Sequence, residues 1–240
     1  MQIQAIIFDL FHTLTGPDAE WSELPWTADV LGVDRGVWNE LLVSRSRWRL
    51  AGQETDAHTI VRTLAREIDP DIAEERIQEA TRVRIQRFKD SLTRIPVENV
   101  ETLRDLRAAG LRLGLISNAD VMEAAPWPTS PLAGLFDVAL FSCAVGLVKP
   151  EPEIYARCIQ ALGVSPGECL FVGDGGSNEL VGAKAAGMST VFVSGVMAEL
   201  WPERIEERRA ISDHHVERIP ELLSLLDLTG GCSRRPSGAE

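Results

Sequence analysis

The chain contains little lysine and little cysteine, and it lacks any long run of apolar residues. Its four cysteines show no Cys-x-x-Cys spacing, which argues against a disulfide framework. The early apolar run at residues 3–10 is too short to span a membrane, contains Asp9, and lacks the basic start and cleavage site of a signal peptide. We therefore expect a cytoplasmic protein that is neither secreted nor anchored in a membrane.

Positive charge is also scarce. The 240 residues carry 24 basic and 36 acidic side chains, which gives a formal net charge of −12. Such a balance argues against binding to nucleic acid or to an anionic membrane, so small molecules are the expected partners. Only three of the basic residues are lysines, which makes a lysine inside a motif informative. Nothing in the sequence indicates the oligomeric state.

The first third of the chain combines one strand with a helical block. Residues 3–9 form an apolar run that ends in an acid, which is typical of a buried parallel strand with a functional group at its carboxyl end. No strand signal interrupts the helical periodicity that follows, and we expect residues 17–94 to form an all-helical cap. Its expected helices span residues 34–51, 55–68 and 71–92, with Asp34, Thr55 and Asp71 as N-caps.

Strand and helix patterns alternate in the remainder of the chain. The expected strands are residues 111–117, 138–142, 169–173 and 189–194, and the expected helices are residues 97–109, 151–162, 177–186 and 217–226. This alternation predicts an α/β fold, a Rossmann-like parallel sheet with helices on both faces, plus the helical cap inserted after the first strand. The α/β core would comprise residues 1–16 and 95–228. Residues 229–240 are small, polar and rich in glycine, and we expect a disordered tail there.

Polar residues follow four of the predicted strands or their loops, at the sheet edge where ligands of such folds bind. They are Asp9 with Thr13, Ser117 with Asn118, Lys149 before Pro150, and Asp174 with Glu179. Together with the helical insertion, these motifs resemble the haloacid dehalogenase superfamily, whose members use a strand-end aspartate as nucleophile on phosphate esters or, in fewer cases, on carbon–halogen bonds. The resemblance covers nearly the whole chain and includes the order and spacing of the motifs.

The resemblance implies catalytic roles for Asp9, Ser117 and Lys149. Asp9 stands where the family's nucleophile stands, and a carboxylate that attacks phosphorus splits hydrolysis into two displacements through an aspartyl-phosphate. Ser117 would donate its hydroxyl to a phosphoryl oxygen, while Lys149 would neutralise charge on the nucleophile and the phosphoryl group. Thr13 and Asn118 are the expected substrate-binding residues. Taken singly, such residues also have plain structural explanations, for example a turn after a strand.

Asp174 precedes a Gly-Gly turn, which lets the backbone bring its carboxylate over the same site as Asp9. Two carboxylates beside a phosphate would repel it, so we expect Mg²⁺ as the cofactor. By resemblance the metal ligands are Asp9, the main-chain carbonyl of Phe11, and Asp174. Glu179 stands where the family usually has a second aspartate, and it either binds the metal through a water or serves only as a charge at a helix N-terminus.

Phe11 departs from the pattern of the family's phosphatases. These enzymes usually carry a second aspartate at this position, which protonates the leaving group, and phenylalanine transfers no proton. His12 replaces the usual glycine and is our candidate acid–base residue, although simple packing or solvent exposure also explains a histidine there. Dehalogenases of the family have an aromatic residue at this position, so Phe11 favours them, whereas Asp174 favours the metal-dependent phosphatases.

The function we favour from the sequence is a Mg²⁺-dependent phosphatase that acts on a small, anionic phosphate ester. The alternatives are a hydrolase of the 2-haloacid dehalogenase type and a catalytically weak member that binds a phosphorylated ligand. Dehalogenation would require a cap arginine, for which Arg45 and Arg49 are candidates, although we expect both on a solvated helix face. We expect the cap tryptophans to pack between the cap helices, and Trp21 and Trp26, which follow the first motif, are also candidates for lining the substrate entrance.

Overall fold

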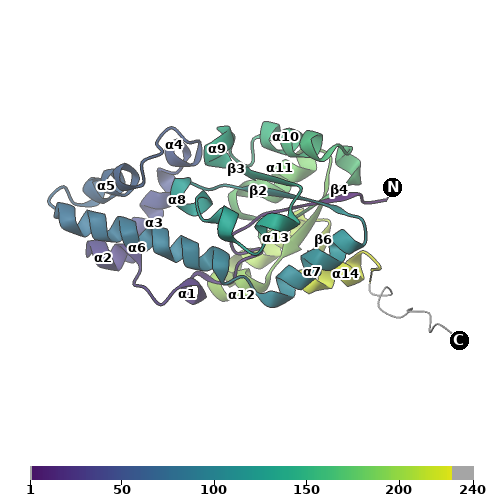
Figure 1. The fold of residues 1–240 in the computed structure, drawn as a ribbon, viewed down its shortest axis with the longest axis horizontal. Helices are drawn as coiled ribbons and strands as arrows, with labels where there is room; N and C mark the ends of the chain where they lie inside the picture. The colour runs from purple at the N-terminus through teal and green to yellow at the C-terminus, as the bar shows by residue number, and fades with distance from the viewer. Residues whose placement is uncertain (1, 229–240) are drawn as a thin grey trace, which may run out of the picture.

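A computed structural model of the protein describes residues 2–228 (Figure 1). Within these residues, six parallel strands form one sheet in the order β3-β2-β1-β4-β5-β6. The strands are β1 (Ala5–Phe8), β2 (Arg112–Ser117), β3 (Val138–Phe141), β4 (Cys169–Gly173), β5 (Ser189–Val193) and β6 (His214–Val216). The expected tail at residues 229–240 lies outside the described part of the chain. The α/β, Rossmann-like fold with an inserted helical cap is confirmed.

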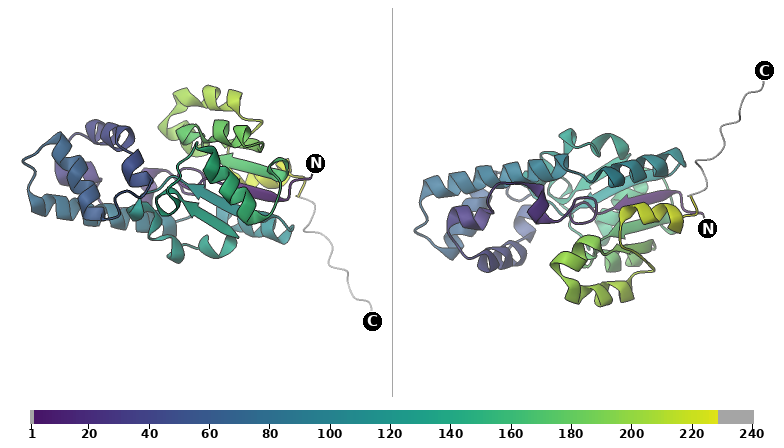
Figure 2. Two further views of the ribbon diagram at one scale, coloured as in Figure 1. Left: turned by 90° about the horizontal axis from the view of Figure 1, so that it is seen from above. Right: turned by 90° about the horizontal axis from the view of Figure 1, so that it is seen from below.

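The central strand β1 divides its side chains between two apolar cores, one on each face of the sheet. Ile6 and Phe8 belong to one core, and Ala5 and Ile7 belong to the other. All four are fully buried, as expected for a strand that helices cover on both faces (Figure 2). Helices α7 (Val97–Ala108) and α14 (Leu222–Leu225) supply the first core, and α10 (Pro152–Leu162) and α11 (Glu179–Ala185) supply the second.

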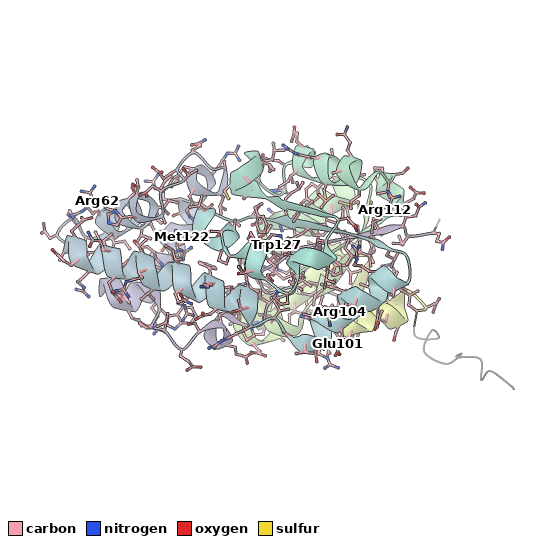
Figure 3. All side chains as sticks on the ribbon, viewed as in Figure 1. Arg62, Glu101, Arg104, Arg112, Met122 and Trp127 are labelled. Atoms are coloured by element: carbon pink, nitrogen blue, oxygen red, sulfur yellow. The ribbon has the colours of Figure 1, made fainter. Side chains whose placement is uncertain are left out.

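The helices between β1 and α7 lie beyond one end of the sheet (Figures 1 and 2). They are α1 (Asp18–Trp21), α2 (Thr27–Leu31), α3 (Arg35–Ser44), α4 (Arg47–Leu50), α5 (Ala57–Ile68) and α6 (Glu74–Thr93). They share an apolar cluster that includes Trp21 and Trp38, and Met122 of α8 (Val121–Ala124) joins it from the core (Figure 3). The exact domain limits stay a prediction. None of the helices within residues 2–228 has the length and apolar character needed to cross a membrane.

The cap helices differ in detail from those expected. The helix predicted at residues 34–51 is split into α3 and α4, because the backbone leaves helical geometry between them. Asp34 is confirmed as the N-cap of α3, since its side chain accepts a hydrogen bond from a main-chain amide in the first turn. Thr55 and Asp71 are wrong as N-caps: the neighbouring Asp56 caps α5, and α6 begins without a side-chain cap.

The segment after β5 holds more structure than the sequence pattern indicated. Helices α12 (Gly195–Leu200) and α13 (Ile205–Ile211) precede β6, and the helix expected at residues 217–226 is only α14 after a 3-10 turn. Strand β6 has three residues, of which only Val216 is buried, so it shows no period-two pattern. Elements this short bury too few side chains to leave a readable periodicity.

A substitution of Gly114 in β2 tests how tightly the sheet packs against α10. A Cβ at this position would lie 2.9 Å from Cys158 Sγ, 3.0 Å from Leu162 Cδ1 and 3.3 Å from Ile7 Cγ1. We expect G114A to lower the free energy of unfolding by about 1–3 kcal/mol, because the core has to shift to accept the methyl group. The control G134A changes a glycine with no such atom within 4 Å and should alter that free energy by less than about 0.5 kcal/mol. Equal values for the two variants in urea unfolding would contradict this packing.

Candidate active site

Asp9 lies directly after β1 at the carboxyl edge of the sheet and is 7% exposed. Its main-chain amide donates to the carbonyl of Val172 in β4 at 2.9 Å, so Asp9 continues the hydrogen-bond ladder of the sheet. The hydroxyl of Thr13 donates to Asp9 Oδ2 at 2.9 Å. The sheet therefore fixes the backbone of Asp9, and Thr13 orients its carboxylate.

Lys149 is the buried cation of the site. Its Nζ lies 2.5 Å from Asp9 Oδ1 and 2.5 Å from Glu179 Oε2, and the residue is 3% exposed. Burial alone would lower the pKa of Lys149, but the two carboxylates together raise it well above its usual range. Lys149 therefore stays protonated at neutral pH. Its two ion pairs connect Asp9 of the first motif with Glu179 of the last.

Residues at the end of β2 support this arrangement. The side-chain amide of Asn118 donates to the main-chain carbonyl of Lys149 at 3.0 Å and accepts from its main-chain N–H at 2.8 Å. This positioning contact was not predicted, and the expected contact of Asn118 with substrate stays a prediction. Ser117 is buried, and its hydroxyl has no hydrogen-bond partner among residues 2–228, so it is free to donate to a ligand.

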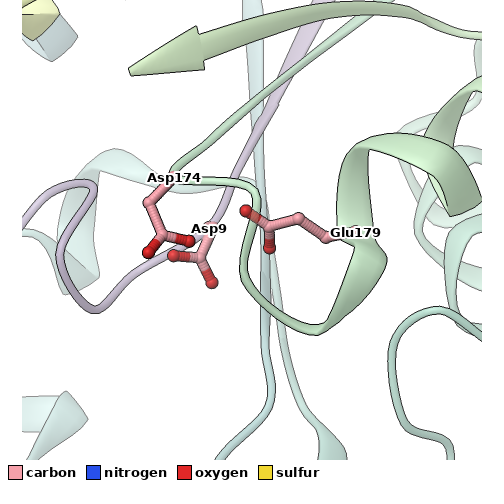
Figure 4. Close-up of side chains that lie close together, drawn as sticks. All are labelled: Asp9, Asp174 and Glu179. Atoms are coloured by element: carbon pink, nitrogen blue, oxygen red, sulfur yellow. The ribbon is translucent and has the colours of Figure 1, made fainter. Parts of the chain in front are cut away.

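Asp174 and Glu179 bring two more carboxylates to Asp9 (Figure 4). One carboxylate oxygen of each of these three residues lies within 4.8 Å of the others, and all three residues are buried. Burial and then the negative charge of Asp9 raise the pKa of Asp174. The same two causes raise the pKa of Glu179, against the influence of Lys149. The carboxyl groups thus repel one another in a poorly solvated place.

The glycines around Asp174 make this convergence possible. A Cβ at Gly173 would lie 2.1 Å from Glu179 Oε1, so only glycine leaves room for that carboxylate. Gly175 has a φ of 82°, which other residues rarely adopt, and its amide donates to Glu179 Oε1 at 3.0 Å. The amide of Gly176 donates to Asp174 Oδ1 at 2.7 Å. The main-chain amides of this turn therefore orient the carboxylates of Asp174 and Glu179.

The donor set fits a divalent cation such as Mg²⁺. Carboxylate oxygens are the hard ligands that this ion prefers, and it relieves repulsion between converging acids. Both oxygens of Glu179 already accept hydrogen bonds, from Lys149 and from Gly175. Both oxygens of Asp9 also accept hydrogen bonds, from Lys149 and from Thr13, so these contacts do not separate the three acids. As the family resemblance implies, Asp9, Asp174 and the main-chain carbonyl of Phe11 would bind the ion, with Glu179 acting through a water.

Arg208 of α13 is a site residue that sequence reasoning missed. Its Nη1 donates to the main-chain carbonyl of Asp174 at 2.5 Å and lies 3.5 Å from Asp174 Oδ2. Arg208 is itself buried, so it adds a second fixed cation beside the carboxylates. Arg208 lies 34 residues after Asp174, on a helix and not at the end of a strand, so no motif marks it.

Phe11 and His12 both contact residues of the cap. The Phe11 ring packs against Trp21 and Phe88, each at a centroid distance of 5.5 Å. His12 adopts a positive φ of 63° and stacks on Trp21, and its Nε2 is hydrogen-bonded to Asp18 Oδ1. Burial alone would lower the pKa of His12, but Asp18 raises it above its ordinary value. The histidine is thus held by an acid rather than left free in solvent.

A cavity of about 520 Å³ lies between the cap helices and the first motif, and it reaches the site through Phe11, His12 and Asn118. Six aromatic side chains line it, namely Phe11, Trp21, Trp26, Trp38, Phe88 and Trp201. Trp21 and Trp26 therefore line a cavity, and Trp21 also packs in the apolar cluster of the cap, while a role of either residue at a substrate entrance stays a prediction.

Two buried ion pairs join the cap to the core at one wall of this cavity. Arg49 donates to Asp120 Oδ2 at 2.8 Å, and Arg84 donates to Glu123 Oε1 at 2.8 Å. The expectation of a solvated helix face is wrong for Arg49, because α4 packs against the core there. It holds for Arg45, which is exposed and pairs with Glu67.

The ion pairs of Lys149 predict a large cost for removing its charge. K149M leaves Asp9 and Glu179 buried without their shared cation, and we expect it to lower the free energy of unfolding by about 3–5 kcal/mol in the presence of EDTA. K89M changes an exposed lysine of α6 and should alter that free energy by less than about 0.5 kcal/mol. Urea unfolding measures both variants. A K149M protein as stable as K89M would show that the ion pairs do not hold the site together.

Comparisons with known proteins identify the family of the chain. The chain matches the haloacid dehalogenase-like hydrolases over residues 3–187. It is 30% identical over 138 residues to the glyceraldehyde 3-phosphate phosphatase of Pyrococcus furiosus, which covers 56% of this chain and 55% of that protein. It is 32% identical over 108 residues to the phosphoserine phosphatase of Thermus thermophilus, which covers 45% of this chain and 43% of that protein. The chain spans about half the length of these curated relatives.

Solved structures share the fold. The crystal structure of a dehalogenase superposes with a TM-score of 0.67 at 24% identity and covers 93% of this chain and 97% of its own. A HAD phosphatase from Thermococcus onnurineus gives a TM-score of 0.59 at 22% identity and covers 94% of this chain and 98% of its own. At such identities these likenesses speak for the fold alone. Because the family match extends from β1 through the motif of Asp174 and Glu179, the protein belongs to the haloacid dehalogenase-like hydrolases.

Proposed function

We propose that the protein is a Mg²⁺-dependent phosphatase that hydrolyses a small phosphate ester through an aspartyl-phosphate on Asp9. The observation that carries this proposal is the convergence of the Asp9, Asp174 and Glu179 carboxylates within 4.8 Å. Lys149 and Arg208 offset only two of these three charges, so an incoming phosphate would meet an excess of negative charge. A divalent cation would resolve this conflict. An enzyme that works without a metal would have no use for this convergence of carboxylates.

The residues of the site divide the reaction into two displacements. In the first, a carboxylate oxygen of Asp9 attacks phosphorus, the bond from phosphorus to the ester oxygen breaks, and the leaving group takes up a proton. In the second, water attacks phosphorus, and inorganic phosphate leaves as the carboxylate of Asp9 is regenerated. Throughout, Lys149 and the free hydroxyl of Ser117 bind the phosphoryl oxygens. A bound Mg²⁺ would supply the remaining positive charge that lets the phosphoryl group approach the carboxylates.

We assign the proton transfer to His12, because Phe11 has no exchangeable proton. The Nε2 atom of His12 is held by Asp18, which leaves Nδ1 to give the proton to the leaving group and later to take one from water. His12 also lines the cavity that would contain the leaving group. Its ring stacks on Trp21, which also lines this cavity.

Phe11 supports the second candidate function, a dehalogenase of the 2-haloacid type. Its ring, packed on Trp21 and Phe88, presents an apolar wall next to Asp9 rather than an acid. Displacement of a halide needs no proton donor, so Phe11 would cost nothing in that reaction. Asp9 would be the nucleophile in that reaction as well, but the reaction needs no metal and gives no role to the second carboxylate that Asp174 brings beside it, and for this reason the phosphatase is our first choice.

Replacing the nucleophile tests the proposal. The purified protein with Mg²⁺ should release phosphate from members of a broad phosphate-ester panel that includes para-nitrophenyl phosphate. D9N should lower kcat by about a thousandfold or more, because an amide does not attack phosphorus. EDTA should abolish the activity as well. D105N, which changes an exposed aspartate of α7, is the matched control and should keep it.

Two results would overturn the phosphatase proposal. Halide release from 2-haloacids with no phosphate release from the panel would identify a dehalogenase. A rise in melting temperature with BeF₃⁻ and Mg²⁺ in a protein that turns over no ester would identify a phosphate-binding protein without catalysis.

The role of His12 predicts a dependence on the leaving group. H12N keeps a side chain that tolerates the positive φ but removes the proton donor. We expect it to lower kcat on an alkyl phosphate about a hundredfold and on para-nitrophenyl phosphate less than about tenfold, because nitrophenolate leaves without protonation. Steady-state phosphate release on the two substrates measures this difference. An equal loss on both would assign His12 to structure rather than to proton transfer.

A further inference from the structure

The side chains that line the cavity beside the site are suited to binding a flat, apolar group. Its volume of about 520 Å³ falls in the range of small-molecule pockets and exceeds what a phosphoryl group occupies. Three of its six aromatic rings form a continuous group, in which Trp21 contacts Phe11 at 5.5 Å and Phe88 at 5.7 Å between centroids. Such rings stack on planar ligands and replace water around them.

Arg87 of α6 contributes a positive charge to this wall. The residue is 6% exposed, and its guanidinium lies 4.2 Å from the centroid of the Trp26 ring. Its hydrogen bonds all go to neutral main-chain carbonyls, those of Ser22 at 3.5 Å, Leu24 at 2.6 Å and Asp18 at 2.8 Å. Among residues 2–228, no carboxylate oxygen lies within 4.0 Å of the Arg87 guanidinium.

The other buried arginines of the cavity wall are different. Arg49 and Arg84 each pair with a carboxylate of the core, Asp120 and Glu123 respectively. A buried cation without a counter-ion is costly, and carbonyls and an aromatic face compensate it only in part. An oxyanion group of a ligand would complete the compensation, because a guanidinium binds carboxylate or phosphate in a two-pronged geometry.

The charge of the whole wall points the same way. Four arginines but only two carboxylates line the cavity, in a chain whose formal net charge is −12. Three of these arginines are paired, Arg35 with Asp29, Arg49 with Asp120 and Arg84 with Glu123, so the positive charge that no ion pair offsets is that of Arg87. An anionic ligand is drawn to this cavity rather than to the acidic remainder of the protein.

We propose that the cavity binds the leaving group of a phosphate ester that has a flat, largely apolar body and a second oxyanion group, and that Arg87 binds this second group. The inference rests on the proposed phosphatase function and adds the substrate class. Arg87 would contribute to specificity and would not take part in the chemistry at phosphorus.

Binding to D9N separates recognition from turnover. Titration calorimetry in the presence of Mg²⁺ would compare meta- and para-carboxyphenyl phosphate with the matching carbamoylphenyl phosphates, in which a neutral amide replaces the carboxylate. We expect the better carboxylate to bind D9N at least about tenfold more tightly than its amide, as a charge-assisted hydrogen bond provides. Adding R87Q should reduce this ratio below about threefold. R87K keeps the charge and should retain part of the preference.

A control on the same helix shows whether any loss belongs to Arg87. Arg82 of α6 faces solvent, with a side chain 73% exposed, and pairs with Glu79. R82Q in the D9N background should keep the full ratio, and circular dichroism would establish that each variant is folded.

The outcomes distinguish this inference from the proposed function. Equal affinities of D9N for carboxylate and amide, or an unchanged ratio in R87Q, would overturn the role of Arg87 and leave the phosphatase proposal standing. Tighter binding of glycerol phosphate than of the carbamoylphenyl phosphates would overturn the aromatic part of the substrate class. Failure of the wild-type protein to release phosphate from any ester would overturn the proposed function, whatever the binding ratios are.

Discussion

The contacts of Lys149 with Asp9 and Glu179 are the interaction on which the rest of the site depends. They tie the end of β1 to the start of α11 through one buried cation, and Asn118 at the end of β2 holds the main chain of that lysine. Three segments far apart in the sequence are thereby fixed at one edge of the sheet. The strand order explains why this is possible, because β1 lies between β2 and β4.

The same contacts leave a charge problem that defines the chemistry. Lys149 and Arg208 offset only two of three buried carboxylates, so the site remains acidic, although the substrate that we propose is an anion. A divalent cation bound by Asp9 and Asp174, as we propose, would reverse the local sign. The cavity between the cap helices and the first motif needs no metal ion for positive charge, because arginine side chains line it beside the aromatic rings. In the proposed reaction, the metal-loaded site and Arg87 would supply the positive charge that meets the anionic substrate.

Much of this arrangement was predictable because parallel strands end at a common edge. Asp9, Ser117, Lys149 and Asp174 follow strands or their loops, and the structure brings Asp9 into contact with Lys149 and close to Asp174. Asn118 shows the limit of such reasoning, since the sequence marks its position but not that its amide binds the main chain of Lys149.

The arginines were not predictable in the same way. Arg87 and Arg208 bond to main-chain carbonyls, which leave no trace in the sequence, and both lie on helices without a motif. Arg49 was expected in solvent, because helical periodicity identifies a polar face but not what that face packs against. Strand β6 was not predicted for another reason, because its three residues are too few to show an alternation of buried and exposed side chains.

The central claim is that Asp9 forms a covalent bond to phosphorus, and trapping that bond tests it most directly. The protein would be mixed with Mg²⁺ and a phosphate ester that it turns over, quenched in acid within the first turnovers, and digested for mass spectrometry. We expect a phosphoryl group on the peptide that contains Asp9, and none on the same peptide of D9N. An unmodified Asp9 under these conditions, together with an ester of Asp9 formed from a 2-haloacid, would contradict it.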